Sequence, residues 1–262
     1  MTSVSRMRRQ HDLAQRQERI LDAAVTLVGE HGYHGLTMDR IAEAIGYSKG
    51  TVYQHFGSKE EVLIHLCVRN TSRVRELFRQ VCAVEAPPRA TMKGLLFAYA
   101  VHLCLHPDDL SYVQMLKSGA FRERTSEVSR RELDEQEQGV YAMVVALVER
   151  AAADGSLTLD APVSSSDLVF GLWAMAYGGL ALMSVGFNFA VWATRPDSSL
   201  GHTYRTFLDG LGWAPASTEW DYGAYLAQLR DEVLVEATAS LSPSDRLRID
   251  GIVTGLAGRR LG

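Results

Sequence analysis

The chain has 262 residues, 47% hydrophobic and 22% charged, values typical of a globular protein with a sizeable core. Its three cysteines, Cys67, Cys82 and Cys104, argue against a disulfide framework and fit a reducing cytoplasm. The net charge is −4, but residues 1–80 hold 12 lysines and arginines against 9 acidic residues, whereas residues 81–262 hold 15 against 22, an asymmetry expected if one end meets a polyanion.

Helical periodicity dominates the chain and strand-like alternation is scarce, which predicts an all-α fold. Residues 1–15 contain Arg6, Arg8 and Arg9, and we expect a flexible basic arm there; an arm that enters the DNA minor groove is the alternative. No apolar run follows these arginines, so we expect no secretory signal. A first helix is predicted over residues 13–32, with Gly32 as its C-terminal cap.

Two short helices are predicted next. The first is capped by Thr37 and ends at Gly46, and the second is capped by Ser48 and turns Val52 and Phe56 inward. A short turn containing glycine joins them, which is typical of a helix-turn-helix, about residues 37–56, whose second helix lies in the DNA major groove. The segment "SKEE" (58–61) reads as a capping box that opens a long fourth helix.

The segment "EAPPRA" (85–90) is a break that coincides with the change of charge. Beyond it, helices are predicted at 90–106, 109–118, 121–154, 164–186, 199–211, 219–240 and 243–258. The apolar segment 168–193 is long enough to span a membrane. It contains four glycines and lacks a flanking basic cluster, so we interpret it as a buried helix and expect no membrane association.

The stretch "ILDAAVTLVGEHGYHGLTMDRIAEAIGYSKGTVYQHFGSKEEVL" resembles the DNA-binding domain of the TetR family of transcriptional regulators. The resemblance covers about residues 16–66. It implies an all-α bacterial homodimer, with an N-terminal three-helix helix-turn-helix DNA-binding domain and a larger helical ligand-binding and dimerisation domain. On this basis the chain is divided into an arm (1–15), a DNA-binding domain (16–66), an effector-binding and dimerisation domain (67–212) and a C-terminal helical extension (213–262).

The resemblance also implies which residues meet DNA. Lys49, Gly50 and Thr51 would lie closest to base edges, and Gln54 is a candidate base reader because its amide can make two hydrogen bonds. Tyr53 and His55 match the family's pair that contacts the DNA backbone, although Tyr53 could also be a packing residue and His55 a solvated one. The remaining candidates for phosphate contact are Thr37, Arg40, Ser48 and Lys59.

The larger, acidic part of the chain diverges more from the family. Aromatic, methionine and histidine residues are the candidates for an effector pocket, and ordinary core positions are the alternative: Phe97, Tyr99, His102, Tyr112, Met115, Tyr141, Trp173 and Tyr177. Such a lining suits a hydrophobic or aromatic effector. The segments "LWAMAYGGLALM" (172–183) and "TYRTFLDGLGW" resemble the family's dimerising helices, and the candidate interface residues are Gly178, Gly179, Met183, Phe207 and Leu211.

His102 and His106 lie one helical turn apart, but no third ligand is identifiable, so we expect no metal site and no cofactor. Motifs of common enzymes are lacking, and we expect no enzymatic activity. The predicted function is a ligand-responsive transcriptional repressor, released from a palindromic double-stranded operator by a small effector in the cytoplasm, at the nucleoid. A TetR-like activator, or a ligand-binding protein whose DNA target differs or is lost, is the alternative.

Overall fold

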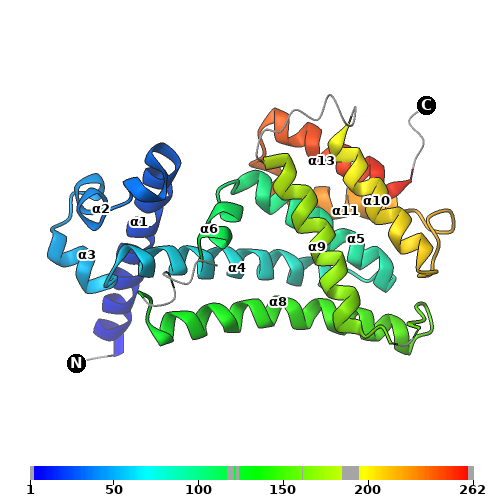
Figure 1. Cartoon of the computed structure of the whole chain (residues 1–262), viewed down its shortest axis with the longest axis horizontal. Helices are drawn as coiled ribbons and strands as arrows, with labels where there is room; N and C mark the ends of the chain where they lie inside the picture. The colour runs from blue at the N-terminus through cyan, green and yellow to red at the C-terminus, as the bar shows by residue number, and fades with distance from the viewer. Residues whose placement is uncertain (1–2, 117–120, 122–123, 161, 185–194, 259–262) are drawn as a thin grey trace. The chain divides into compact units, whose positions relative to one another are not determined.

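The computed structural model describes residues 3–116, 121, 124–160, 162–184 and 195–258 of the protein (Figure 1). These residues form helices and turns, and no strand is found among them, so the predicted all-α fold is confirmed. The chain divides into two compact units, and each unit combines segments that are far apart in the sequence. The first contains Met1–Thr71 and Asp108–Gln136, and the second contains Ser72–Pro107 and Glu137–Gly262. The segment 108–136 therefore belongs with the N-terminal helices, although the sequence places it in the effector domain.

The first unit is built from the N-terminal helices and two later segments. Its helices are α1 (Ser3–Gly35), α2 (Met38–Ile45), α3 (Lys49–His55), the first part of α4 (Lys59–Ala83), α6 (Asp109–Leu116) and the first turns of α8 (Glu127–Ala153). Figure 1 shows α2 and α3 together on one side of α1. Apolar side chains from all of these helices meet in one core, which includes Ile20, Ile41, Val52, Leu63, Tyr112 and Leu133. The core fixes the position of α3, the predicted recognition helix.

Helix α1 is longer than the sequence predicts, because residues 3–15, expected as a flexible arm, are helical. The segment contains three arginines and two glutamines, which are good helix formers, and the side chain of Gln15 is hydrogen-bonded to His11 one turn away, at 2.9 Å. At its other end the helix is interrupted by Gly32, whose φ of +66° lies in the left-handed region that glycine tolerates. The predicted helix end is thus a break in the helix, and a last short turn follows it.

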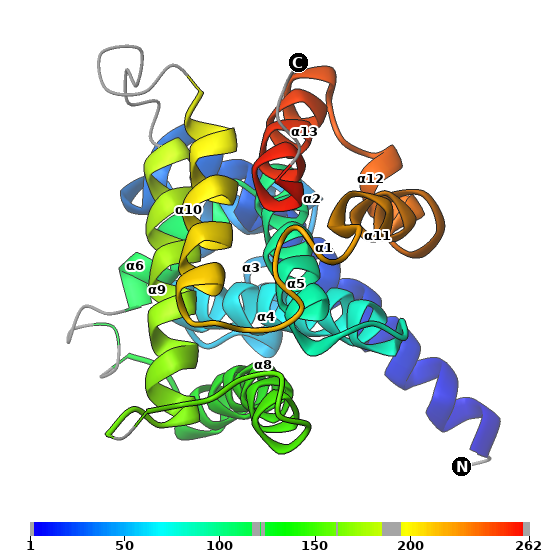
Figure 2. The same cartoon turned by 90° about the vertical axis from the view of Figure 1, so that its right-hand side faces the viewer.

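The second unit surrounds one buried helix. Besides the remaining parts of α4 and α8, it contains α5 (Pro88–Leu105), α9 (Ser165–Ser184), α10 (Pro196–Gly210), α11 (Tyr222–Gln228), the π-helical turn η2 (Leu229–Val233), α12 (Val235–Ala239) and α13 (Pro243–Ala257). Most residues of α5 are buried, because α9, α11, α12 and α13 all contact it. Figure 2 shows α5 between α9 and α10 on one side and α11 on the other. The segment 219–240, predicted as one helix, is divided into α11, η2 and α12.

The C-terminal extension is fastened to α5 by two buried cations. The guanidinium group of Arg89 donates to the carbonyl oxygens of Trp213 (2.5 Å) and Pro215 (3.0 Å) and forms an ion pair with Asp209. The ammonium of Lys93 donates to the carbonyl oxygen of Leu256 at 2.9 Å. Apart from Asp209 of α10, these partners belong to the extension, so the two buried side chains join α5 to it.

Helix α13 packs backbone to backbone on α10. A Cβ atom on Gly201 of α10 would lie 2.4 Å from the carbonyl oxygen of Ile252, and one on Gly255 of α13 would lie 2.4 Å from that of Ser198. Glycine is required at both positions, since no side chain fits at such distances. The extension is thus an integral layer of the second unit.

Among the described residues, one helix is long and apolar enough to cross a membrane. This is α9, and 28% of its most apolar window is buried. A single helix of this composition is weak evidence, because core and interface helices share it.

Candidate nucleic-acid interface

Helix α3 begins where the sequence predicts, at the cap residue Ser48. The hydroxyl oxygen of Ser48 accepts a hydrogen bond from the backbone N–H of Thr51 at 3.1 Å, and the two hydroxyls lie 2.9 Å apart. Gly46 ends α2 with a φ of +67°, as a left-handed cap requires. The two caps set the short turn between α2 and α3. Ser48 thus has a structural task besides any contact with DNA.

The faces of α3 divide as the sequence predicts. Val52 and Phe56 are buried, at 0% and 2% exposure, whereas Tyr53 is 51% exposed. Tyr53 is therefore not a packing residue within the unit. The other predicted contacts of this segment are exposed (Thr37, Arg40, Ser48, Lys49, Gly50 and Gln54) or half-buried (Thr51 and His55). The outward face of α3 thus offers a phenol, an amide and an ammonium group together.

Gly50 lies on this outward face without a structural need for glycine. A Cβ atom there would meet nothing closer than the hydroxyl oxygen of Ser48, at an ordinary contact distance of 3.8 Å. The protein itself would therefore accept alanine at this position. The prediction that glycine lets DNA approach the backbone is compatible with this open space.

Lys49 and Arg40 each have a partner within the unit. The Lys49 ammonium lies 2.5 Å from the Asp39 carboxylate, and this hydrogen bond raises the pKa of Lys49. Arg40 donates to the carbonyl oxygen of Gly35 at 3.0 Å, and its backbone N–H donates to the Thr37 hydroxyl at 3.2 Å. Both cations remain exposed, so they can exchange these partners for phosphate oxygens.

His55 is half-buried at the end of α3. Burial, together with the nearby charge of Arg16 on α1, lowers the pKa of His55. The imidazole is therefore neutral at pH 7, and one ring N–H can act as a hydrogen-bond donor. The charge of Arg16 on α1 thus acts on a side chain of α3, which the sequence alone does not reveal.

Lys59 is less free than predicted. Its ammonium lies 4.2 Å from the centre of the Tyr33 ring and 3.4 Å from the carbonyl oxygen of Tyr33. The Tyr33 hydroxyl in turn donates to Glu60 at 3.1 Å. Burial is the main cause that raises the pKa of Tyr33 to about 12. Lys59 thus joins the end of α1 to the start of α4.

The predicted capping box at the start of α4 forms only in part. The backbone N–H of Glu61 donates to the Ser58 hydroxyl at 3.1 Å. The Glu61 carboxylate does not reach back but accepts from the backbone N–H of Ser126 and, at 2.5 Å, from the hydroxyl of Ser129. It therefore binds the start of α8 to α4. No sequence signal predicts this, since the partners lie 65 and 68 residues apart.

The sequence pattern of the family described as "Bacterial regulatory proteins, tetR family" matches residues 20–66, which include α2, α3 and most of their core. Residues 20–66 are therefore similar to the tetR-family domain. The HTH-type transcriptional repressor AcnR of Corynebacterium glutamicum is 35% identical over 80 residues, which are 30% of this chain and 40% of AcnR. The chain thus spans less than half the length of this curated relative, within its tetR-family part.

Solved structures extend the likeness beyond the tetR-family domain. A transcriptional regulator of the TetR/AcrR family from Thermobifida fusca has a TM-score of 0.57 at 21% identity, covering 75% of this chain and 98% of that one. FadR from Bacillus subtilis, in complex with stearoyl-CoA, has a TM-score of 0.52 at 15% identity, covering 91% and 98%. At these identities the likeness shows a shared fold.

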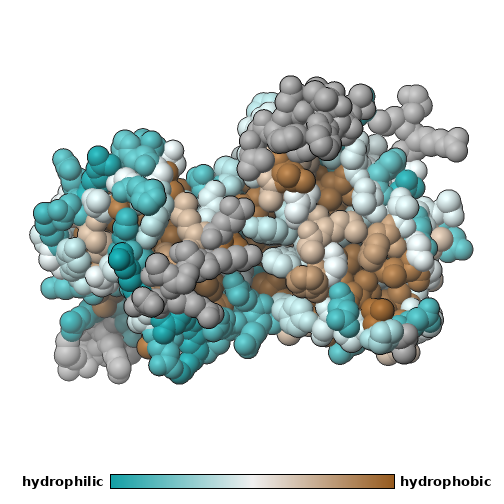
Figure 3. Space-filling view, viewed as in Figure 1, coloured by the Kyte–Doolittle hydropathy of each residue, from teal (hydrophilic) through white to brown (hydrophobic). Residues whose placement is uncertain are grey.

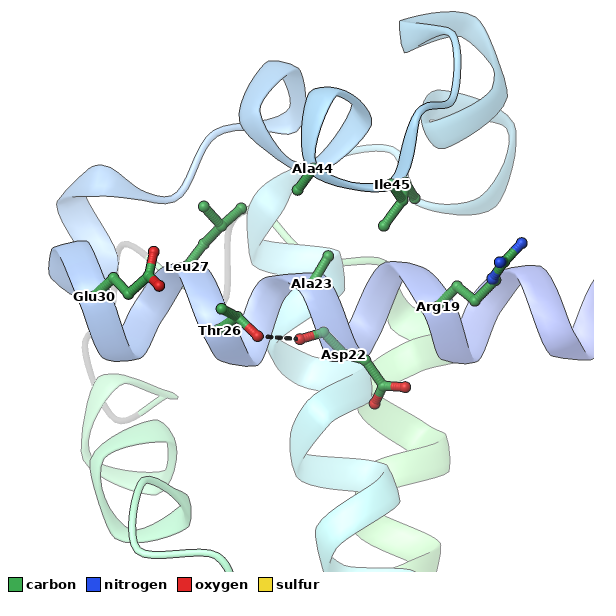
Figure 4. Close-up of a pocket in the computed structure, with 8 residues that line it drawn as sticks. All are labelled: Arg19, Asp22, Ala23, Thr26, Leu27, Glu30, Ala44 and Ile45. Carbon is green, nitrogen blue, oxygen red and sulfur yellow. Dashed lines mark hydrogen bonds between the residues drawn. The ribbon is translucent and has the colours of Figure 1, made fainter.

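Beside the helix-turn-helix, the tetR-family domain has an open cavity of about 520 Å³ between α1 and α2. Figure 4 shows Ala23 and Leu27 of α1 facing Ala44 and Ile45 of α2, with Arg19 at one end and Glu30 at the other. Asp22 and Thr26 complete its lining. None of the predicted effector-binding residues lies here.

The eight predicted effector-pocket residues do not share one unit. Tyr112, at 1% exposure, lies in the core of the first unit, and Met115 packs against that core. In the second unit, Phe97 and His102 are buried in α5 and Tyr99 is half-buried. Tyr141 of α8 and Trp173 of α9 are nearly half exposed, and Tyr177 is half-buried. Tyr112 and Met115 differ from the other six because α6 packs with α1 and α4.

The predicted dimer-interface residues lie on α9, on α10 and just beyond α10. Gly179 packs within the chain, since a Cβ atom there would lie 2.6 Å from Cδ1 of Leu200, whereas Gly178 has open space. Met183, Phe207 and Leu211 are half-buried. The exposed face of α9 carries a row of aromatic rings tilted against one another, with centres 6.3 Å apart for Phe170 and Trp173 and 5.3 Å apart for Trp173 and Tyr177. Figure 3 shows apolar surface along this helix.

The histidine pair His102 and His106 has ring centres 4.9 Å apart. Within the described parts of the chain, no group of three or more histidine, cysteine or acidic residues could hold a metal ion.

Proposed function

We propose that the protein is a transcriptional repressor that binds a palindromic operator as a homodimer and leaves it when a small apolar or aromatic effector binds. The observation that carries the DNA-binding part is the division of α3, in which Val52 and Phe56 fill the core while Tyr53 and Gln54 face solvent. The match of residues 20–66 to the tetR family supports it. The name of the relative AcnR supports repression.

The outward residues have two tasks in this proposal. Lys49, Thr51 and Gln54 contact base edges, and Gly50 lets the backbone come close. Tyr53 and the neutral His55 donate to phosphate oxygens, which fixes the register of α3 in the major groove. The supporting phosphate contacts come from Thr37, Arg40, Ser48 and Lys59. Lys49 must leave Asp39 to reach DNA, so its contact costs an existing ion pair.

The homodimer places two copies of α3 on one palindrome. The support is the exposed aromatic row of α9, since Phe170 is 64% exposed and Trp173 is 46% exposed. Contiguous apolar surface of this kind marks interfaces. A two-fold axis beside α9 would bury the row against its own copy, with the open side of Gly178 allowing close approach.

The effector would bind in the second unit, where Phe97, Tyr99 and His102 on α5 lie on a helix that contacts α9 with Trp173 and Tyr177. FadR, which shares the fold, is described in complex with stearoyl-CoA. An effector lowers operator affinity only by its differential affinity for the bound and free states. We place the protein in the cytoplasm, where operator DNA is, and assign it no enzymatic activity and no cofactor.

Selection from a random pool of DNA duplexes tests the DNA-binding part. The wild type should enrich a palindrome and bind it in gel shifts at least about a thousandfold more tightly than scrambled DNA. Enrichment without two-fold symmetry would contradict the dimeric reading, and no enrichment would contradict DNA-directed repression. Adding stearoyl-CoA and a panel of aromatic compounds to the complex then tests effector release.

A further inference from the structure

Residues 7–16, in the N-terminal half of α1, do not pack against the rest of the unit. Every side chain from Met7 to Arg16 is exposed, and the buried face of the helix begins only at Ile20. An isolated helix of this length is marginally stable in water. The segment therefore has room for a partner along its whole surface.

The charge of this segment differs from that of the domain behind it. Residues 3–19 contain five arginines and two acidic residues, whereas residues 20–66 contain three lysines and arginines against six acidic residues. The span that matches the tetR family is therefore net negative when histidines are neutral. A negative domain is poorly suited to a polyanion, because cation–phosphate contacts supply most of the non-specific affinity for DNA. The N-terminal half of α1 supplies the missing positive charge.

Two of these arginines interact with the helix-turn-helix. Arg19 donates to the hydroxyl of Tyr47, in the turn between α2 and α3, at 3.2 Å, and Arg16 is close enough to His55 of α3 to lower its pKa. Arg8 precedes Arg19 by 11 residues and Arg9 precedes Arg16 by seven, each close to a whole number of helical turns. At about 100° per residue the two pairs form neighbouring rows within an arc of about 100°. We call these four residues the arginine face.

Two acidic residues near this face have partners elsewhere. Glu18 and Asp22 both accept from Arg69 of α4, at 3.1 and 2.7 Å. Only Asp12 interrupts the arginine face between Arg8 and Arg19. From Arg19 to Arg8 the face extends about 16 Å along the helix, at about 1.5 Å per residue, which equals about five base-pair steps of DNA.

We propose that the N-terminal half of α1 is a second DNA-binding element, whose arginine face holds the phosphate backbone beside the half-site read by α3. This inference rests on the proposed function and adds to it a contact outside the matched domain. The element binds phosphates without reading bases, so it raises affinity for every sequence. It becomes fixed in place when DNA is bound.

The test is a triple substitution, R8Q/R9Q/R16Q, which keeps good helix formers and leaves Arg19 on Tyr47. The matched control is R79Q/R131Q/R248Q, which removes three exposed arginines of other helices and changes the net charge equally. Both proteins are compared with wild type for duplex affinity between 50 and 300 mM KCl. The duplexes are the selected palindrome with long flanks, the same palindrome without flanks and a scrambled sequence, and circular dichroism checks folding.

The triple variant should bind every duplex at least about tenfold more weakly, and its salt dependence should be shallower by about two to three in log–log slope for each bound copy of the chain. Removing the flanks should weaken wild type but not the triple variant. If the salt dependence of DNA affinity has the same slope in the triple variant as in wild type, the inference is overturned, even if the variant binds the palindrome. If wild type selects no sequence, the proposed function fails instead, and the slopes on scrambled DNA still decide the inference.

A lipid surface is the competing partner for a basic helix. Sedimentation with vesicles of phosphatidylglycerol and phosphatidylcholine separates the two. Loss of vesicle binding in the triple variant, with unchanged DNA affinity, would overturn the DNA assignment.

Discussion

Tyr53 and Gln54 are neighbours on α3, both exposed, and have different tasks in the proposal. A phenol hydroxyl on a phosphate oxygen reads no sequence, whereas a glutamine amide in the major groove can choose a base. Their shared surroundings make them a matched pair of test positions, because neither side chain contributes to the core.

Tyr53→Phe should weaken binding by about fivefold on palindrome and scrambled DNA alike, since one hydrogen bond is worth about 1 kcal/mol. Gln54→Ala should instead change which base is preferred at one position of each half-site. Competition gel shifts against a set of single-base variants distinguish the two. A uniform loss for Gln54→Ala would remove it from the base readers.

A second prediction at the residue scale concerns Lys93 and the pH dependence of stability. Its ammonium lies 3.4 Å from the centre of the Tyr222 ring, and burial, ahead of the neighbouring Arg89, lowers its pKa from 10.5 to about 7. Because the unfolded chain holds this proton more tightly, the unfolding free energy should rise with pH between about 7 and 10.5. Below pH 7 both states are protonated and the contribution is constant.

The measurement is chemical denaturation of wild type and Lys93→Met across this pH range. Other titrating groups cancel in the difference, so the stability of wild type relative to the variant should increase with pH. A difference that stays flat would show that Lys93 keeps its ordinary pKa.

The residues that cap and fill the helix-turn-helix could be predicted from the sequence, because their signals are local. Ser48, Gly46, Val52 and Phe56 each act within a few residues of their own position. The partners of Glu61 could not be predicted, since Ser126 and Ser129 reach it only through the tertiary fold. The DNA contacts themselves stay predictions.

At the scale of elements, the close packing of α10 on α13 depends on glycine. Gly255→Ala would place a Cβ atom against backbone atoms of α10, which cannot move as a side chain can. We expect a loss of about 2 kcal/mol or more in unfolding free energy. Gly171→Ala in α9, with open space around it, is the control and should stabilise by up to about 1 kcal/mol. Thermal melting of both checks this, and equal melting temperatures would contradict the packing.

Most helices could be predicted from periodicity, but their division into units could not. Tyr112 shows the reason, because the sequence pattern of an aromatic residue in a helix is the same whether its side chain fills a core or lines a pocket. Only the packing of α6 on the N-terminal helices places it in the first unit's core. Residues 1–15 were predicted as a flexible basic arm, whereas α1 extends to Ser3.

At the scale of the whole molecule, dimerisation through α9 predicts a specific loss. Trp173→Asp would put a charge in the middle of the aromatic row, and we expect dimer affinity to fall at least about thirtyfold, as for an interface hot spot. Leu247→Asp on α13, 73% exposed, is the control. Sedimentation velocity should show monomers for Trp173→Asp and dimers for wild type and Leu247→Asp. A monomeric wild type, or a dimeric Trp173→Asp, would contradict an interface at α9.

The central claim is that two copies of α3 read the major groove of one operator. Guanine N7 lies in the major groove, so methylation interference on the selected duplex tests this claim directly. Methylation should block binding at two symmetric clusters with centres one helical turn apart, about 34–36 Å. Interference at a single cluster, or none at guanines of the selected sequence while minor-groove methylation of adenine blocks binding, would contradict it.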